Sequence, residues 1–407
     1  MKLPGIFRFG VERQAKTNCR AMPIWFARHL GKLIPHLFRL AQNINQRTSC
    51  LDFIKGKLGL HRLASAIFAR SSCNVDSLLK VARIDYIESQ VAELRGSGVH
   101  QPHFWVLCAE SMGDIVASEP IARYLKRLAP VSCVHWVVRD VFSEVVVDNP
   151  YVDETFLVKT LADGYDKVLL ECNRKGNILV NCHMDGSRCS QTKRIVRNPA
   201  NPQFNVLNYL HVGSLLTTFS LAAGLPPLDD SPEIYFSKTL DLPFLIKDPY
   251  IVVHCKSSSM TKDWVSQKWN TLLSVATEFG LRVVEIGIAK CIETGNPLYV
   301  DYTGRRNLQK IAWYIKNASA FVGVDSGFAH IANAVKTPSV IILGQSGGIG
   351  EKSIYSGCFS RCRLFVKLRP PSGMSVADIE PDEVWNALQG IVPSLKSDDK
   401  INIEVAP

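Results

Sequence analysis

The sequence predicts an α/β protein in which two Rossmann-like, doubly wound parallel-sheet domains follow a basic helical extension. Three observations support this fold class. Short apolar strand patterns alternate with helical patterns from about residue 99, the same alternation begins again near residue 250, and the excess positive charge precedes both. Buried strands that alternate with helices are typical of parallel sheets covered on both faces. With 407 residues, of which 46% are hydrophobic, the chain is long enough for two such domains.

The first predicted region is the basic extension, residues 1–98. The first hundred residues carry a net charge of +10, and the rest of the chain carries none. Residues 22–44 repeat apolar side chains at three- and four-residue steps with basic side chains on other faces, which predicts an amphipathic helix. Such a helix either contacts an anionic surface such as a membrane or covers a groove on its own protein. A basic face that is simply solvated explains the charge equally well.

The first sheet domain is predicted over residues 99–242. Its strand candidates are 104–109, 133–138, 154–159 and 166–171. A polar segment near 174–205 is expected to form a long loop, and a helix is expected from about 206 to 223.

The second sheet domain is predicted over residues 243–395, after a linker at 240–249, and leaves a tail at 396–407. Its strand candidates are 250–255, 281–287, 298–302, 320–325 and 339–344, and its helices are expected near 265–279, near 307–318 and from 326. In open parallel sheets ligands bind beyond the carboxyl ends of the strands. We therefore expect the strand-to-helix loops of both domains to face a shared cleft.

The segment 320–344 carries the strongest chemical signal. An apolar strand pattern ends at Asp325, and Ser326 and Gly327 open a helix. Serine can cap free backbone N–H groups, glycine lets a ligand approach the backbone, and a helix start favours an anion such as a diphosphate. His330, one turn into the helix, is expected to face that anion. An ordinary capped helix with a surface histidine gives the same pattern.

A second strand-to-helix segment spans residues 103–128. Gly113 provides a tight turn, and Asp114 stands at the entry of the predicted helix. From spacing alone, a helix-capping role explains Asp114 best. Its place on a loop that faces the cleft also suits a general base.

A third segment, 254–269, places serine and lysine side chains between a strand and a helix. Hydroxyl donors and a lysine are the groups that hold a phosphate and offset its charge. A solvated polar loop is the alternative interpretation. The glycine-rich segment 344–353 lacks the spacing of a phosphate-binding P-loop, because Glu351 separates Gly350 from Lys352.

Composition gives further expectations about location and metals. No apolar run reaches the roughly 18 residues of a membrane-spanning helix, and no secretory signal pattern precedes the extension. The 12 cysteines contain no C-x-x-C pair, so reduced thiols in the cytoplasm are expected. Cys358 and Cys362 are the one close pair outside apolar runs, and two ligands cannot complete a tetrahedral metal site. We therefore expect no metal, and also no nucleic-acid partner, because no aromatic and basic RNA motif accompanies the charge.

Together these segments resemble glycosyltransferase family 9, the bacterial heptosyltransferase family. The resemblance covers about residues 103–390 and rests on motifs in the family's order: S-M-G-D at 111–114, K-x-W at 262–264, T-G-x-x-x-L at 303–308, D-S-G-x-x-H at 325–330 and I-x-P-D-E-V-W at 379–385. It implies the GT-B fold, with Asp114 as catalytic base. It also implies donor-binding roles that match Ser257, Ser258, Lys262, Asp325, Ser326, Gly327 and His330.

The resemblance implies an inverting transfer of a sugar, heptose from ADP-heptose, to a hydroxyl group of a lipopolysaccharide-core or related glycan or glycolipid. No metal or other cofactor takes part, and Lys262, His330 and the helix start near Ser326 are expected to offset the charge of the departing diphosphate. Residues 22–44 would contact the inner face of the cytoplasmic membrane. Two alternatives are a transferase that uses another nucleotide sugar or a protein acceptor, and a non-catalytic protein that binds nucleotide sugars.

Overall fold

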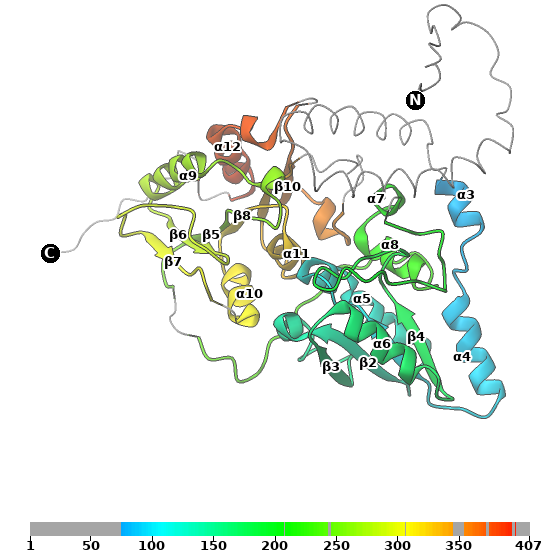
Figure 1. Cartoon of the computed structure of the whole chain (residues 1–407). Helices are drawn as coiled ribbons and strands as arrows, with labels where there is room; N and C mark the ends of the chain where they lie inside the picture. The colour runs from blue at the N-terminus through cyan, green and yellow to red at the C-terminus, as the bar shows by residue number, and fades with distance from the viewer. Residues whose placement is uncertain are drawn as a thin grey trace, which may run out of the picture. The chain divides into compact units, whose positions relative to one another are not determined.

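The computed structural model describes residues 75–206, 208–242, 246–305, 307–344, 354–371, 374–392 and 395, which belong to one compact unit. Two parallel sheets lie at opposite ends of this unit, with helices packed on their faces (Figure 1). Both sheets confirm the predicted fold class. The predicted amphipathic helix at 22–44 and the tail at 396–407 lie outside the described residues. Among the described residues, no helix combines the length and apolar character that crossing a bilayer requires.

The N-terminal lobe contains a four-stranded sheet with the strand order β3-β2-β1-β4. Its strands are β1 (His103–Leu107), β2 (Cys133–Arg139), β3 (Glu154–Val158) and β4 (Asn177–Asn181). Its helices are α3 (Val75–Lys80), α4 (Tyr86–Gly96), α5 (Met112–Leu128), the 3-10 helix η1 (Asp140–Val145), α6 (Leu161–Glu171), α7 (Tyr209–Val212) and α8 (Leu215–Ala222). Helix α4 buries Ile87 and Val91 in the core of this lobe, although it falls within the predicted extension.

The C-terminal lobe contains a six-stranded sheet with the order β10-β9-β8-β5-β6-β7. Its strands are β5 (Tyr250–His254), β6 (Arg282–Ile286), β7 (Tyr299–Asp301), β8 (Ala320–Val324), β9 (Ser339–Ile342) and β10 (Phe365–Leu368). Its helices are η2 (Met260–Lys262), α9 (Ser266–Glu278), α10 (Leu308–Lys316), α11 (Gly327–Ala334), η3 (Phe359–Arg361), η4 (Val376–Asp378) and α12 (Pro381–Ile391). All five strand candidates of this lobe are confirmed, and β10 was not predicted.

Two predictions in the N-terminal lobe are wrong. The strand predicted at 166–171 is the second half of α6, and the true strand β4 lies inside the predicted loop at 174–205. A short apolar run cannot by itself distinguish a strand from a buried helix. The decisive local signal is a capping box, in which Asp163 N donates to Thr160 Oγ1 and Thr160 N donates to Asp163 Oδ2, both at 3.1 Å.

The predicted helix from 206 to 223 is also interrupted. Helix α7 ends before Gly213, and α8 begins anew at Leu215. The Ser214 side chain accepts a hydrogen bond from Thr217 N at 3.2 Å and so caps the second helix. Leu215 and Phe219 of this second helix line the cleft.

The two lobes are joined by polar contacts between η1 and α10. The Glu144 carboxylate accepts a hydrogen bond from Leu308 N at the start of α10. The buried side chain of Gln309 donates to Glu144 O at 3.1 Å and to the Asp148 carboxylate. Because the first N–H groups of a helix have no partner within the helix, Glu144 satisfies one of them from the opposite lobe.

Replacing Glu144 with alanine should therefore weaken the contact between the lobes. We expect the Glu144→Ala substitution to lower the free energy of unfolding by about 1–2 kcal/mol, the usual cost of losing a helix-capping group. Urea denaturation measures this change. Glu93→Ala on the exposed face of α4 is the matched control, and an equal loss in both variants would contradict a role for Glu144 between the lobes.

Candidate active site

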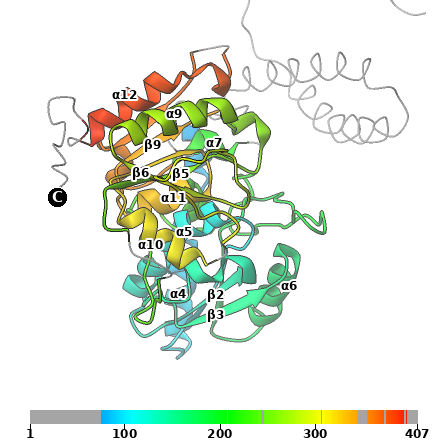
Figure 2. The same ribbon diagram turned by 90° about the vertical axis from the view of Figure 1, so that its left-hand side faces the viewer.

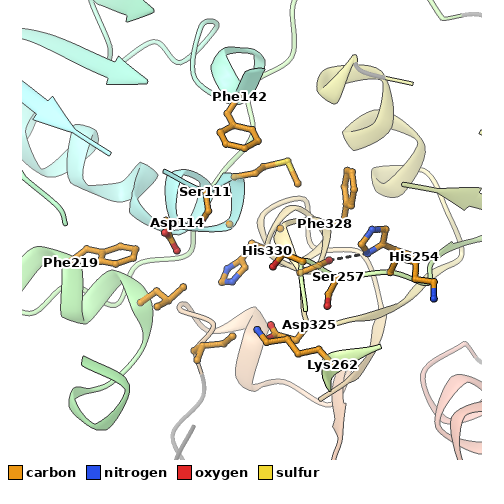
Figure 3. Close-up of a pocket in the computed structure, with 18 of the residues that line it drawn as sticks. Ser111, Asp114, Phe142, Phe219, His254, Ser257, Lys262, Asp325, Phe328 and His330 are labelled. Atoms are coloured by element: carbon orange, nitrogen blue, oxygen red, sulfur yellow. Dashed lines mark hydrogen bonds and ion pairs between the residues drawn. The ribbon is translucent and has the colours of Figure 1, made fainter. Parts of the chain in front are cut away.

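A cavity of about 880 Å³ lies between the lobes, at the carboxyl ends of β1, β5 and β8 (Figure 3). The predicted site residues all line it: Asp114 from the N-terminal lobe, and Ser257, Ser258, Lys262, Asp325, Ser326, Gly327 and His330 from the C-terminal lobe. The second view of the ribbon shows α5 and α11 in the middle of the unit, between the two sheets (Figure 2). The shared cleft expected from the two parallel sheets is thus present.

The starts of α5 and α11 meet at two glycines. A Cβ atom on Gly113 would lie 2.9 Å from the His330 ring, and one on Gly327 would lie 3.2 Å from Gly113 N and 2.5 Å from the end of the Met112 side chain. Real Cβ atoms do not approach other atoms so closely without displacing them. Glycine at both positions therefore lets the two helix starts, one from each lobe, touch beside the cavity.

The start of α11 has backbone N–H groups without a capping side chain. Ser326 occupies the capping position, but its hydroxyl group pairs with His254 Nδ1 at 3.0 Å instead of with the helix (Figure 3). The structure thus corrects the expected capping role of Ser326. Ala329 N donates to Ser326 O at 3.1 Å, so the N–H groups of Gly327 and Phe328 are the ones left for an anion. The helix dipole favours negative charge there.

Lys262 and Asp325 form a partly buried ion pair in which only Asp325 is fully shielded from solvent. Lys262 Nζ lies 2.7 Å from Asp325 Oδ2, and the Tyr355 hydroxyl donates to Asp325 Oδ1 at 2.8 Å. Burial would raise the pKa of Asp325, but the Lys262 ammonium and these hydrogen bonds outweigh burial and lower that pKa. An ammonium group has three N–H donors. Lys262 can therefore bind both Asp325 and a phosphate oxygen.

Two of the cavity histidines, His330 and His254, are neutral at physiological pH. Burial lowers the pKa of His330 to about 4 and that of His254 to about 4, because an apolar environment disfavours the charged ring. His330 can therefore face an anion only as a neutral hydrogen-bond donor. A neutral imidazole still provides one N–H donor and one acceptor. The positive charge on this wall comes instead from Lys262 and from Lys256, which the sequence did not single out.

Asp114 lies in the first turn of α5, next to His330 (Figure 3). Burial raises the pKa of Asp114 to about 6, and the nearby carboxylate of Glu110 adds to the rise. A hydrogen bond with Ser111 and the charge of Lys262 hold the pKa below what burial alone would give. A carboxylate with this pKa is mostly ionised at pH 7 and is more basic than an exposed aspartate, which suits a general base.

The rest of the N-terminal wall was not predicted. It consists largely of apolar and aromatic side chains that come from η1, from the loop after β4 and from the α7–α8 region: Phe142, Met184, Val206, Tyr209, Leu215 and Phe219. These residues are scattered along the sequence, and no local motif marks them. His183 also lines the cavity, and its Nε2 accepts a hydrogen bond from Ala109 N at 3.1 Å. Among the described lining residues, no three potential metal ligands lie close enough to share an ion.

Comparison with known proteins finds a match for part of the chain. Residues 228–348 match the sequence model of glycosyltransferase family 9 (heptosyltransferase). This segment includes Ser257, Lys262 and the Asp325–His330 turn, whereas Asp114 lies before it.

Two curated relatives and one solved structure are similar over different lengths. The chain is 27% identical over 121 residues to lipopolysaccharide heptosyltransferase 1 of Salmonella typhimurium. The aligned segment covers 27% of this chain and 38% of that relative. It is 29% identical over 132 residues to the autotransporter heptosyltransferase Aah of Escherichia coli. This aligned segment covers 30% of this chain and 32% of that relative. Thus the chain matches only about a third of the length of these relatives. The structure of Escherichia coli ADP-heptose lipopolysaccharide heptosyltransferase II superposes with a TM-score of 0.52 at 15% identity, over 72% of this chain and 99% of that one. The fold is of the GT-B type.

Removing Lys262 should leave a buried carboxylate without its cation. We expect Lys262→Ala to lower the free energy of unfolding by about 3 kcal/mol, because Asp325 keeps only the hydrogen bond from Tyr355. Lys256→Ala is the matched control, since the Lys256 ammonium lies 3.9 Å from Asp263 and is half exposed. Chemical denaturation of both variants makes the comparison, and equal stabilities would contradict the ion pair's structural role.

Proposed function

We propose that the chain is an inverting glycosyltransferase that transfers heptose from ADP-heptose to a hydroxyl group of a lipopolysaccharide-core or related glycan acceptor. The main support is that one cavity joins a basic carboxylate, Asp114, with an open helix start and a lysine on the opposite wall. Asp114 provides a base for an acceptor hydroxyl, and the helix start with the lysine provides a site for a diphosphate. The matched family domain and the names of the relatives support the choice of heptose.

The donor is proposed to bind along the C-terminal wall. Its diphosphate would accept hydrogen bonds from the first N–H groups of α11 and from the Lys262 ammonium, while Ser257 and Ser258 lie on the loop beside them. In this arrangement the sugar would extend past the helix start toward Asp114.

The reaction would then proceed in one displacement. Asp114 removes the proton from an acceptor hydroxyl, the resulting oxygen attacks the anomeric carbon, and the bond between that carbon and the diphosphate oxygen breaks on the opposite face. General-base catalysis of this kind contributes about 100- to 10,000-fold. The negative charge that develops on the leaving diphosphate is stabilised by Lys262 and by the dipole of α11. Neutral His330 can donate one hydrogen bond to the same group.

A protein acceptor is the second candidate. It is supported by the similarity to an autotransporter heptosyltransferase, whose 29% identity equals that of one of the lipopolysaccharide enzymes. The donor chemistry would be unchanged, and a protein hydroxyl would replace the glycan hydroxyl at Asp114. Mass spectrometry of glycans and of surface proteins from cells with and without the gene separates the two acceptors.

We also propose a cytoplasmic location with peripheral contact between residues 22–44 and the inner face of the cytoplasmic membrane. The concentration of positive charge in the first hundred residues supports this contact. The segment lies outside the described residues. Vesicle sedimentation with anionic and with neutral lipids tests the contact directly.

Replacing the base should abolish transfer without affecting donor binding. For Asp114→Asn we expect the turnover of ADP-heptose with acceptor to fall by about 100-fold or more, while the donor dissociation constant stays within about twofold because the donor contacts come from the other lobe. Single-turnover kinetics and calorimetry measure the two quantities. Glu93→Gln, on the exposed face of α4, is the control, and unchanged turnover in Asp114→Asn would remove Asp114 from the mechanism.

The pH dependence of kcat/KM should follow the ionisation of Asp114. Only the carboxylate accepts a proton, so activity falls as pH drops through the pKa of about 6. We expect kcat/KM at pH 5 to be about tenfold below its value at pH 8. Lys262 lowers the pKa of Asp114, so Lys262→Ala should move the midpoint to higher pH. A midpoint that stays in place would contradict the electrostatic link between the two residues.

A further inference from the structure

A cluster of three potential metal ligands lies in the core of the C-terminal lobe. Each of Cys255, Glu285 and Cys291 offers one ligand atom, and these three atoms lie within 4.8 Å of one another. The exposed fractions are 1% for Cys255, 0% for Glu285 and 9% for Cys291. The cluster is separate from the residues that line the cavity, although His254 and Lys256 on either side of Cys255 belong to that lining.

The fold brings the three side chains together from distant parts of the sequence. Strands β5 and β6 are parallel neighbours, with Val253 opposite Glu285. Side chains two residues apart on a strand share a face, so Cys255 follows Val253 on the face that carries Glu285. The chain after β6 then folds back, and the backbone N–H groups of Cys291 and Ile292 donate to the Glu285 carboxylate at 2.7 and 3.1 Å.

Glu285 is a fully buried acidic side chain that forms no ion pair with any described residue. Its carboxylate accepts three hydrogen bonds from neutral donors, the two backbone N–H groups and the Tyr299 hydroxyl at 2.7 Å. Among the ion pairs of the described residues, none involves Glu285. A fully buried carboxylate without a cation is costly. A bound divalent cation would supply the missing positive charge.

We propose that Cys255, Glu285 and Cys291 bind a thiophilic divalent metal ion such as Zn²⁺, which acts as a structural metal and stabilises the C-terminal lobe. Two thiolates and one carboxylate are ligands that Zn²⁺ accepts. Most structural zinc sites have four ligands, which leaves a position for water or for the Ser266 hydroxyl, 3.2 Å from Cys291 Sγ. Tyr299 and the two backbone N–H groups orient the carboxylate, as outer partners of a metal ligand commonly do.

The bound metal ion would stabilise one wall of the cavity. The loop between β6 and Cys291 contributes Ile288 and Ala289 to the cavity lining. A metal that ties Cys291 to the end of β5 holds both ends of this loop. The ion takes no part in sugar transfer, so the inference is independent of the proposed function.

Cobalt binding to the full chain tests the site. Co²⁺ replaces Zn²⁺ in such sites, and its thiolate-to-metal absorption in the near ultraviolet reports sulfur ligands. We expect the reduced, chelator-treated protein to bind one Co²⁺ with this absorption, and Cys255→Ser and Cys291→Ser to lose it. Cys358→Ser, at an exposed thiol in the same lobe, is the matched control and should keep it.

Two conservative variants keep both thiols and guard against loss of folding. Glu285→Gln removes the charge and Tyr299→Phe removes one orienting hydroxyl, and each should weaken Co²⁺ binding by about 10- to 100-fold. Zn²⁺ should raise the melting temperature of the wild-type protein more than that of either variant. The proposal is wrong if reduced wild-type protein shows no thiolate absorption with Co²⁺, or if the Cys255→Ser, Cys291→Ser double variant retains it.

Discussion

The close approach of two helix starts, one from each lobe, is the constraint on which the cavity depends. Gly113 and Gly327 allow α5 and α11 to touch, and a side chain at either position would push His330 or the α5 backbone away. Because the first residues of both helices point into the same space, a carboxylate and an anion-binding helix start come to face each other. The contact between η1 and α10 holds the lobes in this relation at a second point.

Burial then decides which groups in the cavity carry charge. It raises the pKa of Asp114 and lowers that of His330 and His254, so the carboxylate becomes more basic while both imidazoles stay neutral. Lys262 pairs with Asp325 and connects the two walls, since it also lowers the pKa of Asp114. The result is an asymmetric cavity in which the base stands on a largely apolar wall and the lysines stand on the other.

Burial also distinguishes the two acidic clusters of the C-terminal lobe, the one around Asp325 and the one around Glu285. Asp325 is buried with a cation of its own, and its charge is neutralised within the protein. Glu285 is buried with neutral donors alone among the described residues, and two thiols lie beside it. The first arrangement suits a site that exchanges a charged ligand. The second suits a permanently bound ion that fixes the sheet and the loop behind the cavity.

The sequence by itself determined the parallel-sheet fold, most strand positions and the polar residues at the ends of β1, β5 and β8, because those features are local in the chain. It failed for 166–171 and for β4, where a short apolar run and a polar strand gave ambiguous periodicity and the capping box at Thr160 decided the helix. Only the tertiary structure decided the apolar wall around Phe219, the neutral state of His330 and the meeting of Cys255 with Glu285. Each of these depends on segments distant in sequence and on the burial that their packing produces.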